Sequence, residues 1–300
     1  MLPLVSIVIS TYNKKEKLAR CLESLKKLTY PRYEIIVIDN GCDDNTSEMV
    51  GKKFPHARLN RIEKNSGPAV GRNVGIRLSK GEFVFILDDD NVVDKAILTN
   101  LVDGIQSDRR IGIVGPKMYY LGNPNKIWVA GGDINPMNSR TSYLGNVMDN
   151  GQFEEKREVG HFPNAFLVRK SIAEEVGGFD ESYFFIYEES DFSEQVRRAG
   201  YKIVLIPSAK TWHDIDPPEN IETIRKYSLH TSERAYYMSR NRALYMKKNS
   251  SLVQYLIFLM GFFPLINLQY ILIILLHGNL DSLKNYAKGI VDGLCGRGRI

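Results

Sequence analysis

Cysteine is scarce in this sequence of 300 residues, and its three cysteines, Cys21, Cys42 and Cys295, lie far apart. No CxxC pair occurs, so the sequence predicts neither a structural zinc site nor a disulfide framework, and reduced thiols in a cytosolic setting are expected. The first ten residues also lack a charged segment and a small-residue cleavage site. No signal peptide is expected.

The chain has only a small excess of positive charge. Its 40 Lys and Arg residues and 35 Asp and Glu residues give a net charge of +5. The basic residues are spread along the chain rather than gathered in one arm, so no nucleic-acid partner is expected. The composition, 43% hydrophobic and 25% charged, is typical of a globular protein. The length suffices for one large domain or two smaller ones.

Strand-like and helix-like segments alternate in the first 95 residues. Short β-branched apolar runs at 5–10, 34–40 and 83–87 have the length of buried strands, and 46–54 and 68–80 have helical patterns. This alternation predicts an α/β fold with a mostly parallel sheet. In such a sheet, ligands bind at the carboxyl ends of the strands.

Three consecutive aspartates, Asp88, Asp89 and Asp90, follow the third apolar run directly. Asp is common in turns, so the trio alone has a structural explanation. At the ligand-binding edge of a sheet, however, adjacent carboxylates repel one another unless a cation lies between them, and hard oxygen ligands suit Mg2+ or Mn2+. Such an ion would also neutralise charge on a leaving diphosphate.

Four segments of the N-terminal half resemble the nucleotide-binding half of the family 2 glycosyltransferases, which are inverting enzymes with the GT-A fold. The segments read VSIVISTYNKKEKLARCLESL, EIIVIDNGCDDNT, NSGPAVGRNVGI and FILDDDN. The resemblance implies a Rossmann-like nucleotide-diphospho-sugar transferase fold. It covers residues 4–215 strongly and 232–250 weakly.

The resemblance also implies roles for the aspartates. In the family, the DxD motif contacts the sugar nucleotide and holds its divalent metal, so Asp88 and Asp89 are assigned to the sugar nucleotide and Asp90 and Asp88 to Mg2+ or Mn2+. His213 follows a predicted strand where some relatives place a histidine that completes the metal shell, and imidazole is a competent ligand for such ions. A lone histidine also has a purely structural explanation.

The nucleoside pocket is implied by the same resemblance. Thr11 and Tyr12 at the end of the first strand, and Asp39 at the end of the second, would line it, and Arg72 would lie close to the base or the diphosphate. Independently, the Asp39 carboxylate can accept a hydrogen bond from an imide N–H, which uracil and thymine carry. A UDP-sugar or dTDP-sugar donor is therefore favoured.

The second half of the chain carries GGFDE followed by EESD at 188–191. In the family, a GGFDE segment precedes an acidic element whose second acid deprotonates the acceptor hydroxyl, which assigns the general base to Glu189, with Asp191 as the alternative. Independently, a helix N-terminus favours ionised carboxylates, and an ionised carboxylate is what a base needs. A helix cap with solvated acids is the structural alternative.

Beyond residue 215 the composition changes. Residues 236–249 form a basic stretch that resembles the RN-containing helix of rhamnosyltransferase-like bacterial and archaeal relatives, and 252–276 is apolar and long enough to span a bilayer. Gly261 and Pro264 interrupt the apolar segment, so we expect a re-entrant or interfacial pair of short helices bent near Pro264 on the inner leaflet. A single transmembrane span and a hairpin buried against a partner subunit are the alternatives. Basic residues on both sides favour keeping both ends in the cytosol: Lys247, Lys248, Lys284, Lys288, Arg297 and Arg299.

Together these features predict a GT-A catalytic domain at 1–215, with a nucleotide-sugar half at 1–95 and an acceptor and base half at 96–215, followed by a helical extension at 216–300. The expected function is that of a metal-dependent, inverting glycosyltransferase of hexosyltransferase type at the cytoplasmic face of the cell membrane. It would move a sugar from a nucleoside diphosphate to a hydroxyl of a lipid-linked or cell-surface glycan.

Two other functions stay open from the sequence alone. The string DDDNVV satisfies DxDxV, the motif of haloacid dehalogenase-like phosphatases, although there the first Asp closes the first strand of the fold. A non-catalytic, membrane-tethered sugar-nucleotide binder is the second alternative. A nucleotidyltransferase is disfavoured because STYNKKEKL is not the Gly-rich, basic signature expected after the first strand.

Overall fold

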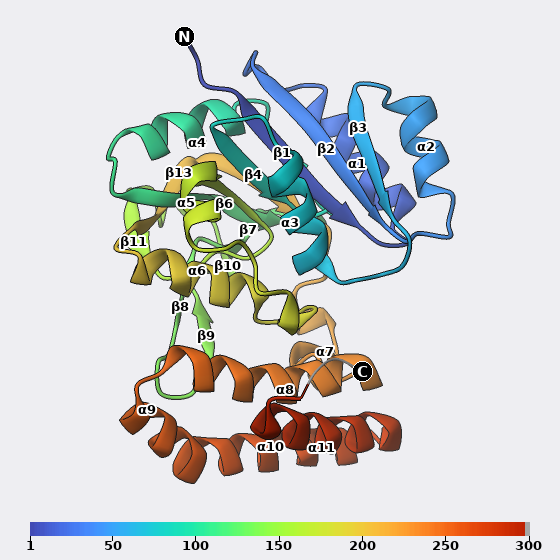
Figure 1. Cartoon of the computed structure of the whole chain (residues 1–300), viewed down its shortest axis with the longest axis vertical. Helices are drawn as coiled ribbons and strands as arrows, with labels where there is room; N and C mark the ends of the chain where they lie inside the picture. Colours follow the sequence, from blue (N-terminus) through green and yellow to red (C-terminus); the bar gives the residue numbers. More distant parts are fainter. Residues whose placement is uncertain (298–300) are drawn as a thin grey trace.

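The fold begins with a parallel sheet that carries the predicted ligand-binding edge. The computed structural model describes residues 1–297. Its first four strands lie in the order β3, β2, β1 and β4, and all their pairings are parallel (Figure 1). This half consists of β1 (Val5–Thr11), α1 (Lys15–Leu25), β2 (Tyr33–Asn40), α2 (Thr46–Lys53), β3 (Ala57–Ile62), α3 (Pro68–Leu78) and β4 (Phe83–Leu87).

The second half extends the sheet through an antiparallel strand. Strand β12 pairs antiparallel with both β4 and β6, and β13 then runs parallel to β6. Strand β13 also pairs with the short β5, which places His213 opposite Asn91, directly after the aspartates. This half consists of β5 (Asn91–Val93), α4 (Ile97–Gln106), β6 (Ile111–Tyr120), β7 (Asn123–Val129), β8 (Gly132–Ile134), β9 (Thr141–Tyr143), β10 (Val147–Met148), β11 (Arg157–Val159), β12 (Ala165–Arg169), α5 (Lys170–Glu175), η1 (Glu181–Tyr183), α6 (Glu188–Arg198) and β13 (Lys202–His213).

The predicted parallel sheet and its flanking helices are confirmed. One apolar core cluster runs through both halves, from Val5 to Ala209. Helix α3 packs closely on β1 because Gly71 and Gly75 face that strand: an added Cβ would lie 2.1 Å from Ser10 Oγ or from Val8 Cγ1. Because of this close packing, the first turns of α3, which carry Pro68 and Arg72, lie at the carboxyl ends of the strands.

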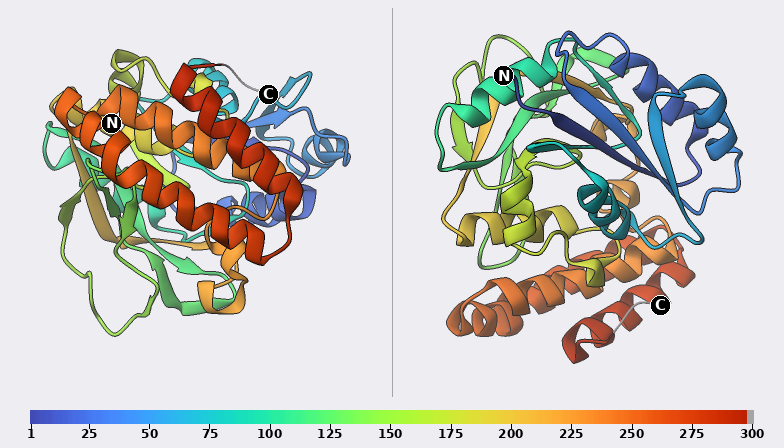
Figure 2. Two further views of the ribbon diagram at one scale, coloured as in Figure 1. Left: turned by 90° about the horizontal axis from the view of Figure 1, so that it is seen from below. Right: turned by 45° about the horizontal axis from the view of Figure 1, so that its top comes forward.

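The C-terminal residues form a layer of helices at one end of the molecule, farthest from the N-terminus (Figure 1). Helix α11 packs along α8, and the views from below and from the tilted side show the same layer (Figure 2). The layer consists of η2 (Pro218–Asn220), α7 (Thr223–Lys226), α8 (Ser232–Asn249), α9 (Leu252–Ile257), the π turn η3 (Phe258–Phe262), α10 (Phe263–Leu276) and α11 (Leu280–Cys295). The division of the chain at residue 215 stays a prediction.

The apolar segment differs from the expected pair of separate short helices. It is one helical segment, Leu252–Leu276, long and apolar enough to cross a membrane, and 28% of its most apolar window is buried. The interruption expected near Pro264 is a π turn over Phe258–Phe262. Proline lacks an N–H, so the backbone adjusts just before it without ending the helix. Arg299 lies outside the described residues.

Candidate active site

A cavity of about 790 Å³ opens at the carboxyl ends of β1, β2 and β4 and reaches the C-terminal helices. Six of the predicted site residues line it: Thr11, Tyr12, Arg72, Asp88, Asp89 and Glu189. It is completed by residues from far along the chain, among them Arg234, Arg242 and Tyr270. The cavity thus joins the predicted nucleotide-sugar half, the predicted base and the helical layer.

Arg72, on α3, connects the aspartates to the start of α6. Its Nη2 lies 2.7 Å from Asp88 Oδ1 and 2.7 Å from Glu189 Oε1, and its Nη1 lies 3.1 Å from Glu188 Oε1. The arginine side chain is only 4% exposed. Its charge is therefore matched by protein carboxylates, and it positions the two acidic segments against each other.

Glu189 stands at the start of α6 and lines the cavity. Its Oε1 also accepts a hydrogen bond from the backbone N–H of Asn164 at 3.0 Å. Burial raises the pKa of Glu189 to about 8, although Arg72 and the Asn164 N–H both favour the carboxylate. The expected effect of the helix N-terminus is therefore outweighed by burial, and the ionised group is a stronger base than an ordinary glutamate.

Asp191, the alternative base, points elsewhere. Its carboxylate is buried and lies 2.8 Å from Lys248 Nζ, 2.8 Å from Asn249 Nδ2 and 3.3 Å from the Tyr183 hydroxyl. It is not among the residues that line the cavity in the described part of the chain. The geometry therefore favours Glu189 over Asp191 as a base, and gives Asp191 a role in docking the end of α8.

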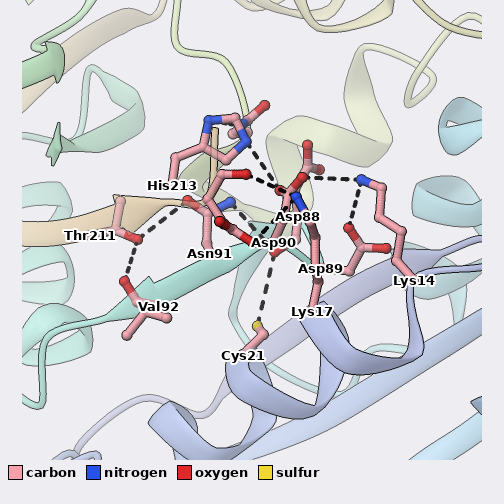
Figure 3. Close-up of polar contacts among 12 residues, drawn as sticks. Lys14, Lys17, Cys21, Asp88, Asp89, Asp90, Asn91, Val92, Thr211 and His213 are labelled. Carbon is pink, nitrogen blue, oxygen red and sulfur yellow. Dashed lines mark hydrogen bonds and ion pairs between the residues drawn. The ribbon is translucent and has the colours of Figure 1, made fainter. Parts of the chain in front are cut away.

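A lysine that the sequence analysis did not single out, Lys14, lies among the aspartates (Figure 3). Its Nζ is 3.0 Å from Asp89 Oδ1 and 3.1 Å from Asp90 Oδ2. Asp89 also accepts a hydrogen bond from the Thr11 hydroxyl at 2.8 Å, and burial raises the pKa of Asp89 to about 6. Lys14 is recognisable in the sequence only as one of several lysines after the first strand.

Asp90 and His213 form the best candidate cation site. His213 Nε2 lies 3.1 Å from Asp90 Oδ1, but the two groups are not aligned for a hydrogen bond. This buried oxygen therefore has no hydrogen-bond partner within residues 1–297. Although burial opposes ionisation, His213 and Lys14 hold the pKa of Asp90 below its usual range. An unpartnered carboxylate oxygen beside an imidazole fits a divalent metal.

The third predicted metal ligand, Asp88, is turned toward Arg72 instead. The part of the chain that the structure describes contains no group of three or more His, Cys, Asp or Glu side chains arranged to hold a metal ion. Asp90 and His213 are therefore two candidate ligands, and Asp88 would join them only after releasing Arg72.

Asp39, predicted to face the nucleoside, is fully buried. Its carboxylate accepts hydrogen bonds from the Cys42 N–H at 2.7 Å, from Arg61 Nη1 at 2.9 Å and from the Ser47 hydroxyl. Asn40, the next residue, lines the cavity in its place, and so does Tyr12, which is 44% exposed. An imide N–H would reach Asp39 only by displacing one of these donors.

The loop before Glu188 has an unusual backbone that α8 holds in place. Phe184, Ile186 and Tyr187 have φ angles of 63°, 66° and 81°, in the left-handed region that side chains other than glycine rarely adopt. The Asn241 side-chain amide donates to the carbonyls of Phe185 at 2.9 Å and Ile186 at 2.8 Å, and to that of Tyr183 at 2.8 Å. These bonds fix the segment that delivers Glu188 and Glu189 to the cavity.

The family model for glycosyl transferase family 2 matches residues 6–177, which is more than half of the chain. The chain belongs to this family. Glycosyltransferase GlyG of Streptococcus pneumoniae is 31% identical over 118 residues, which cover 38% of this chain and 39% of the relative. The N-acetylglucosaminyl-diphospho-decaprenol L-rhamnosyltransferase of Mycobacterium tuberculosis is 27% identical over 238 residues, or 71% of this chain and 76% of the relative.

This family 2 chain aligns with about half or less of the length of several curated relatives that it matches. Among solved structures, GalNAc-T7 with UDP, GalNAc and Mn2+ superposes with a TM-score of 0.62 at 19% identity, over 81% of this chain and 51% of that one. At that identity the likeness shows the fold alone, and the predicted GT-A fold is confirmed. Family membership, and the position of Asp88 after β4 rather than β1, argue against the phosphatase alternative.

Proposed function

We propose that this chain is an inverting glycosyltransferase that moves a sugar from a nucleoside diphosphate to a hydroxyl of a lipid-linked or cell-surface glycan. The observation that carries the proposal is the meeting of Asp88, Arg72 and Glu189 at one cavity, with ion-pair distances of 2.7 Å on both sides of the arginine. The family match and the relatives that are named glycosyltransferases support it.

The donor would bind where β1 and β4 end. Tyr12 and Asn40 offer the exposed wall for the nucleoside, and the Thr11 hydroxyl positions Asp89. A UDP or dTDP donor is proposed on the condition that its imide N–H displaces one of the donors that now occupy Asp39 behind this wall. GalNAc-T7, which shares the fold, was solved with UDP.

Glu189 would act as the general base. Its Oε1 is held by Arg72 and Asn164, whereas its Oε2 accepts no hydrogen bond from residues 1–297. Oε2 would take the proton of the acceptor hydroxyl, whose oxygen forms a bond to the anomeric carbon as the bond from that carbon to the leaving diphosphate breaks on the opposite face. Such a single displacement would invert the configuration at the anomeric carbon.

A divalent cation would be held by Asp90 and His213, with Asp88 as a third ligand. When bound, Mg2+ or Mn2+ supplies positive charge to the leaving diphosphate. The side chains that fit this role are the orphaned Asp90 oxygen and the neighbouring imidazole. The Mn2+ in the GalNAc-T7 structure supports the assignment.

The chain would work at the cytoplasmic face of a membrane. Helices α9, α10 and α11 and the π turn η3 expose apolar side chains, which we call together the leucine face. Exposed apolar side chains that gather in this way mark a membrane or protein contact. The leucine face consists of Leu252, Val253, Leu256, Ile257, Met260, Phe262, Leu265, Leu268, Leu272, Leu275, Leu276, Leu280, Val291 and Leu294.

Calorimetric titration with UDP, dTDP, GDP and CMP, each with and without Mn2+, tests the donor site. We expect metal-dependent binding of one nucleoside diphosphate, lost in Asp90→Ala, and inversion of the anomeric carbon in the transfer product. No binding to any of the four nucleotides would contradict the proposed donor site, whereas binding without any transfer would favour the non-catalytic alternative.

A further inference from the structure

A buried arginine without a counter-charge lies at the far end of the cavity. Arg242, on α8, is 2% exposed, and its Nη1 has no hydrogen-bond partner in the described part of the chain. Its other polar contacts are to neutral groups: Nε lies 3.2 Å from the Tyr187 hydroxyl, and Nη2 lies 3.0 Å from the Tyr270 hydroxyl and 3.6 Å from the Met238 sulfur. No carboxylate of residues 1–297 lies within 4.0 Å of it.

An isolated buried charge is costly unless an ion or a strong hydrogen-bond acceptor compensates it. Arginine stays ionised in proteins, so Arg242 does not escape the cost by losing its proton. Because Arg242 lines the cavity, a ligand anion is the natural compensating group. Its planar guanidinium is well suited to phosphate oxygens.

A second arginine reinforces this end of the cavity. Arg234 lies two turns earlier on α8, lines the same cavity and sits over the Phe185 ring at 5.4 Å, with no carboxylate ion pair among the described residues. The other charged residues that line this end are Lys226, Arg140, which donates to Gln269 at 2.6 Å, the exposed acid Glu233, and Glu188, which is already paired with Arg72. The local balance is positive.

This positive end is separate from the place proposed for the donor diphosphate. The donor would lie against Lys14 and the aspartates at the ends of β1 and β4, whereas Arg242 comes from α8 and contacts Tyr187. Tyr187 immediately precedes Glu188 and Glu189 on the chain. An anion on Arg242 would therefore bind beside the segment that carries the base, away from the aspartates that face the donor.

Helix α10 lies between the positive end and the leucine face. The Arg242 guanidinium lies 4.7 Å from the centre of the Tyr270 ring on α10. Tyr270 is buried, while Leu268 and Leu272, two residues away on either side, are 56% and 50% exposed. Positions two apart on a helix point to different sides, so Tyr270 faces Arg242 and the two leucines face away from it, across a helix about 10 Å wide. A molecule that joins a phosphate to a long apolar chain would reach both surfaces by passing around α10.

We propose that Arg242 and Arg234 bind the phosphate or diphosphate of a lipid-linked acceptor, whose apolar chain lies along the leucine face. The acceptor assignment rests on the proposed glycosyltransferase function, but the binding site does not. The site would hold the lipid phosphate while the acceptor sugar reaches Glu189. It would thereby select lipid-linked over free saccharides.

The test uses farnesyl diphosphate as a probe, with farnesol and inorganic diphosphate as its two halves, titrated into the full chain in detergent micelles. We expect farnesyl diphosphate to bind more tightly than either half. Arg242→Ala should weaken its binding about 10- to 100-fold, the effect of losing charge-assisted hydrogen bonds, and Arg234→Ala about 3- to 10-fold. Nucleoside diphosphate binding with Mn2+ should change less than about twofold in both variants.

Arg109→Ala is the matched control, because Arg109 is exposed and does not line the cavity. Farnesol binding as tightly as farnesyl diphosphate, or a loss of probe and nucleotide affinity by the same factor in Arg234→Ala, would overturn the proposal. If Arg242→Ala does not fold, Arg234→Ala decides. Nucleotide binding without probe binding would refute this site alone. Arginine-dependent probe binding without nucleotide binding would instead refute the donor site.

Discussion

The aspartate side and the base side of the cavity are built in different ways. Asp89 is held by Thr11 and Lys14, all within the first parallel strands and the turns after them. Glu189 stands after a loop of left-handed residues that Asn241 fixes from α8, across 55 to 58 positions of sequence. The first arrangement follows from consecutive βα units. The second arrangement depends on α8, which follows the last strand of the sheet in the sequence.

The largest effect is expected at the base. Glu189→Gln keeps the shape and the contact to Asn164 but removes the proton acceptor, so transfer should fall about 10²- to 10⁴-fold while nucleotide binding persists. Initial rates and calorimetry on the same sample check this. The matched control Glu194→Gln alters an acid on the same helix that pairs with Arg197 and Arg198. A normal rate in Glu189→Gln would move the base elsewhere.

The next largest effect belongs to the aspartate side. Asp90→Ala removes the orphaned oxygen beside His213, and we expect the Mn2+-dependent part of nucleotide binding to disappear and transfer to fall about 10²- to 10³-fold. Nucleotide titrations with and without Mn2+ measure it. Equal Mn2+ dependence in the variant and the parent would show that the metal is held by other groups.

Asn241→Ala tests the long-range construction of the base side most directly. Three backbone carbonyls lose their donor, so the loop should relax and Glu189 should shift, with about 10- to 100-fold slower transfer. The free energy of unfolding should fall by about 1–3 kcal/mol. Transfer assays and thermal melts read both effects, and Asn285→Ala on α11 serves as the control. Unchanged turnover would mean that the loop holds its shape without α8.

The smallest effect is expected in the pH dependence of transfer, which tests the base side of the cavity. Because burial raises the pKa of Glu189 to about 8, the fraction in the basic form increases as the pH rises through that value. The rate should increase about tenfold per unit up to pH about 8 and level off above it. A pH profile of kcat/KM, which reports the pKa values of the free enzyme, measures this limb. A profile that is flat from pH 6 to 9 would contradict a titrating Glu189.

The aspartate side was largely predictable from the sequence. Continuous apolar runs identify β1, β2 and β4, and the aspartates follow a strand directly. Strand β3 was missed because ARLNRI is a half-buried edge strand with two arginines and no apolar run. The choice between Glu189 and Asp191 was open because both stand in the first turn of one helix. The structure separates them, since positions two apart on a helix point to different sides.

The C-terminal contribution could not be predicted. Arg234, Arg242 and Tyr270 line the cavity only because α8 and α10 fold against it, and no periodicity in the sequence encodes that docking. Asn241 belongs to the RN pair by which residues 236–249 resemble a helix of the relatives, but that resemblance implied no role for it. Its three carbonyl partners depend on backbone angles that no local signal specifies.

The docking of α8 also determines how much of this chain must be kept together in a chimera with a relative. Lys248 and Asn249, the last residues of α8, reach Asp191, while Asn241 holds the loop before Glu189. A chimera that joins residues 1–215 of this chain to the helices of another protein would lose the hydrogen bonds from Asn241 to the loop carbonyls. Asp191 would lose its contacts to Lys248 and Asn249. We expect the smallest exchangeable unit to end after Asn249.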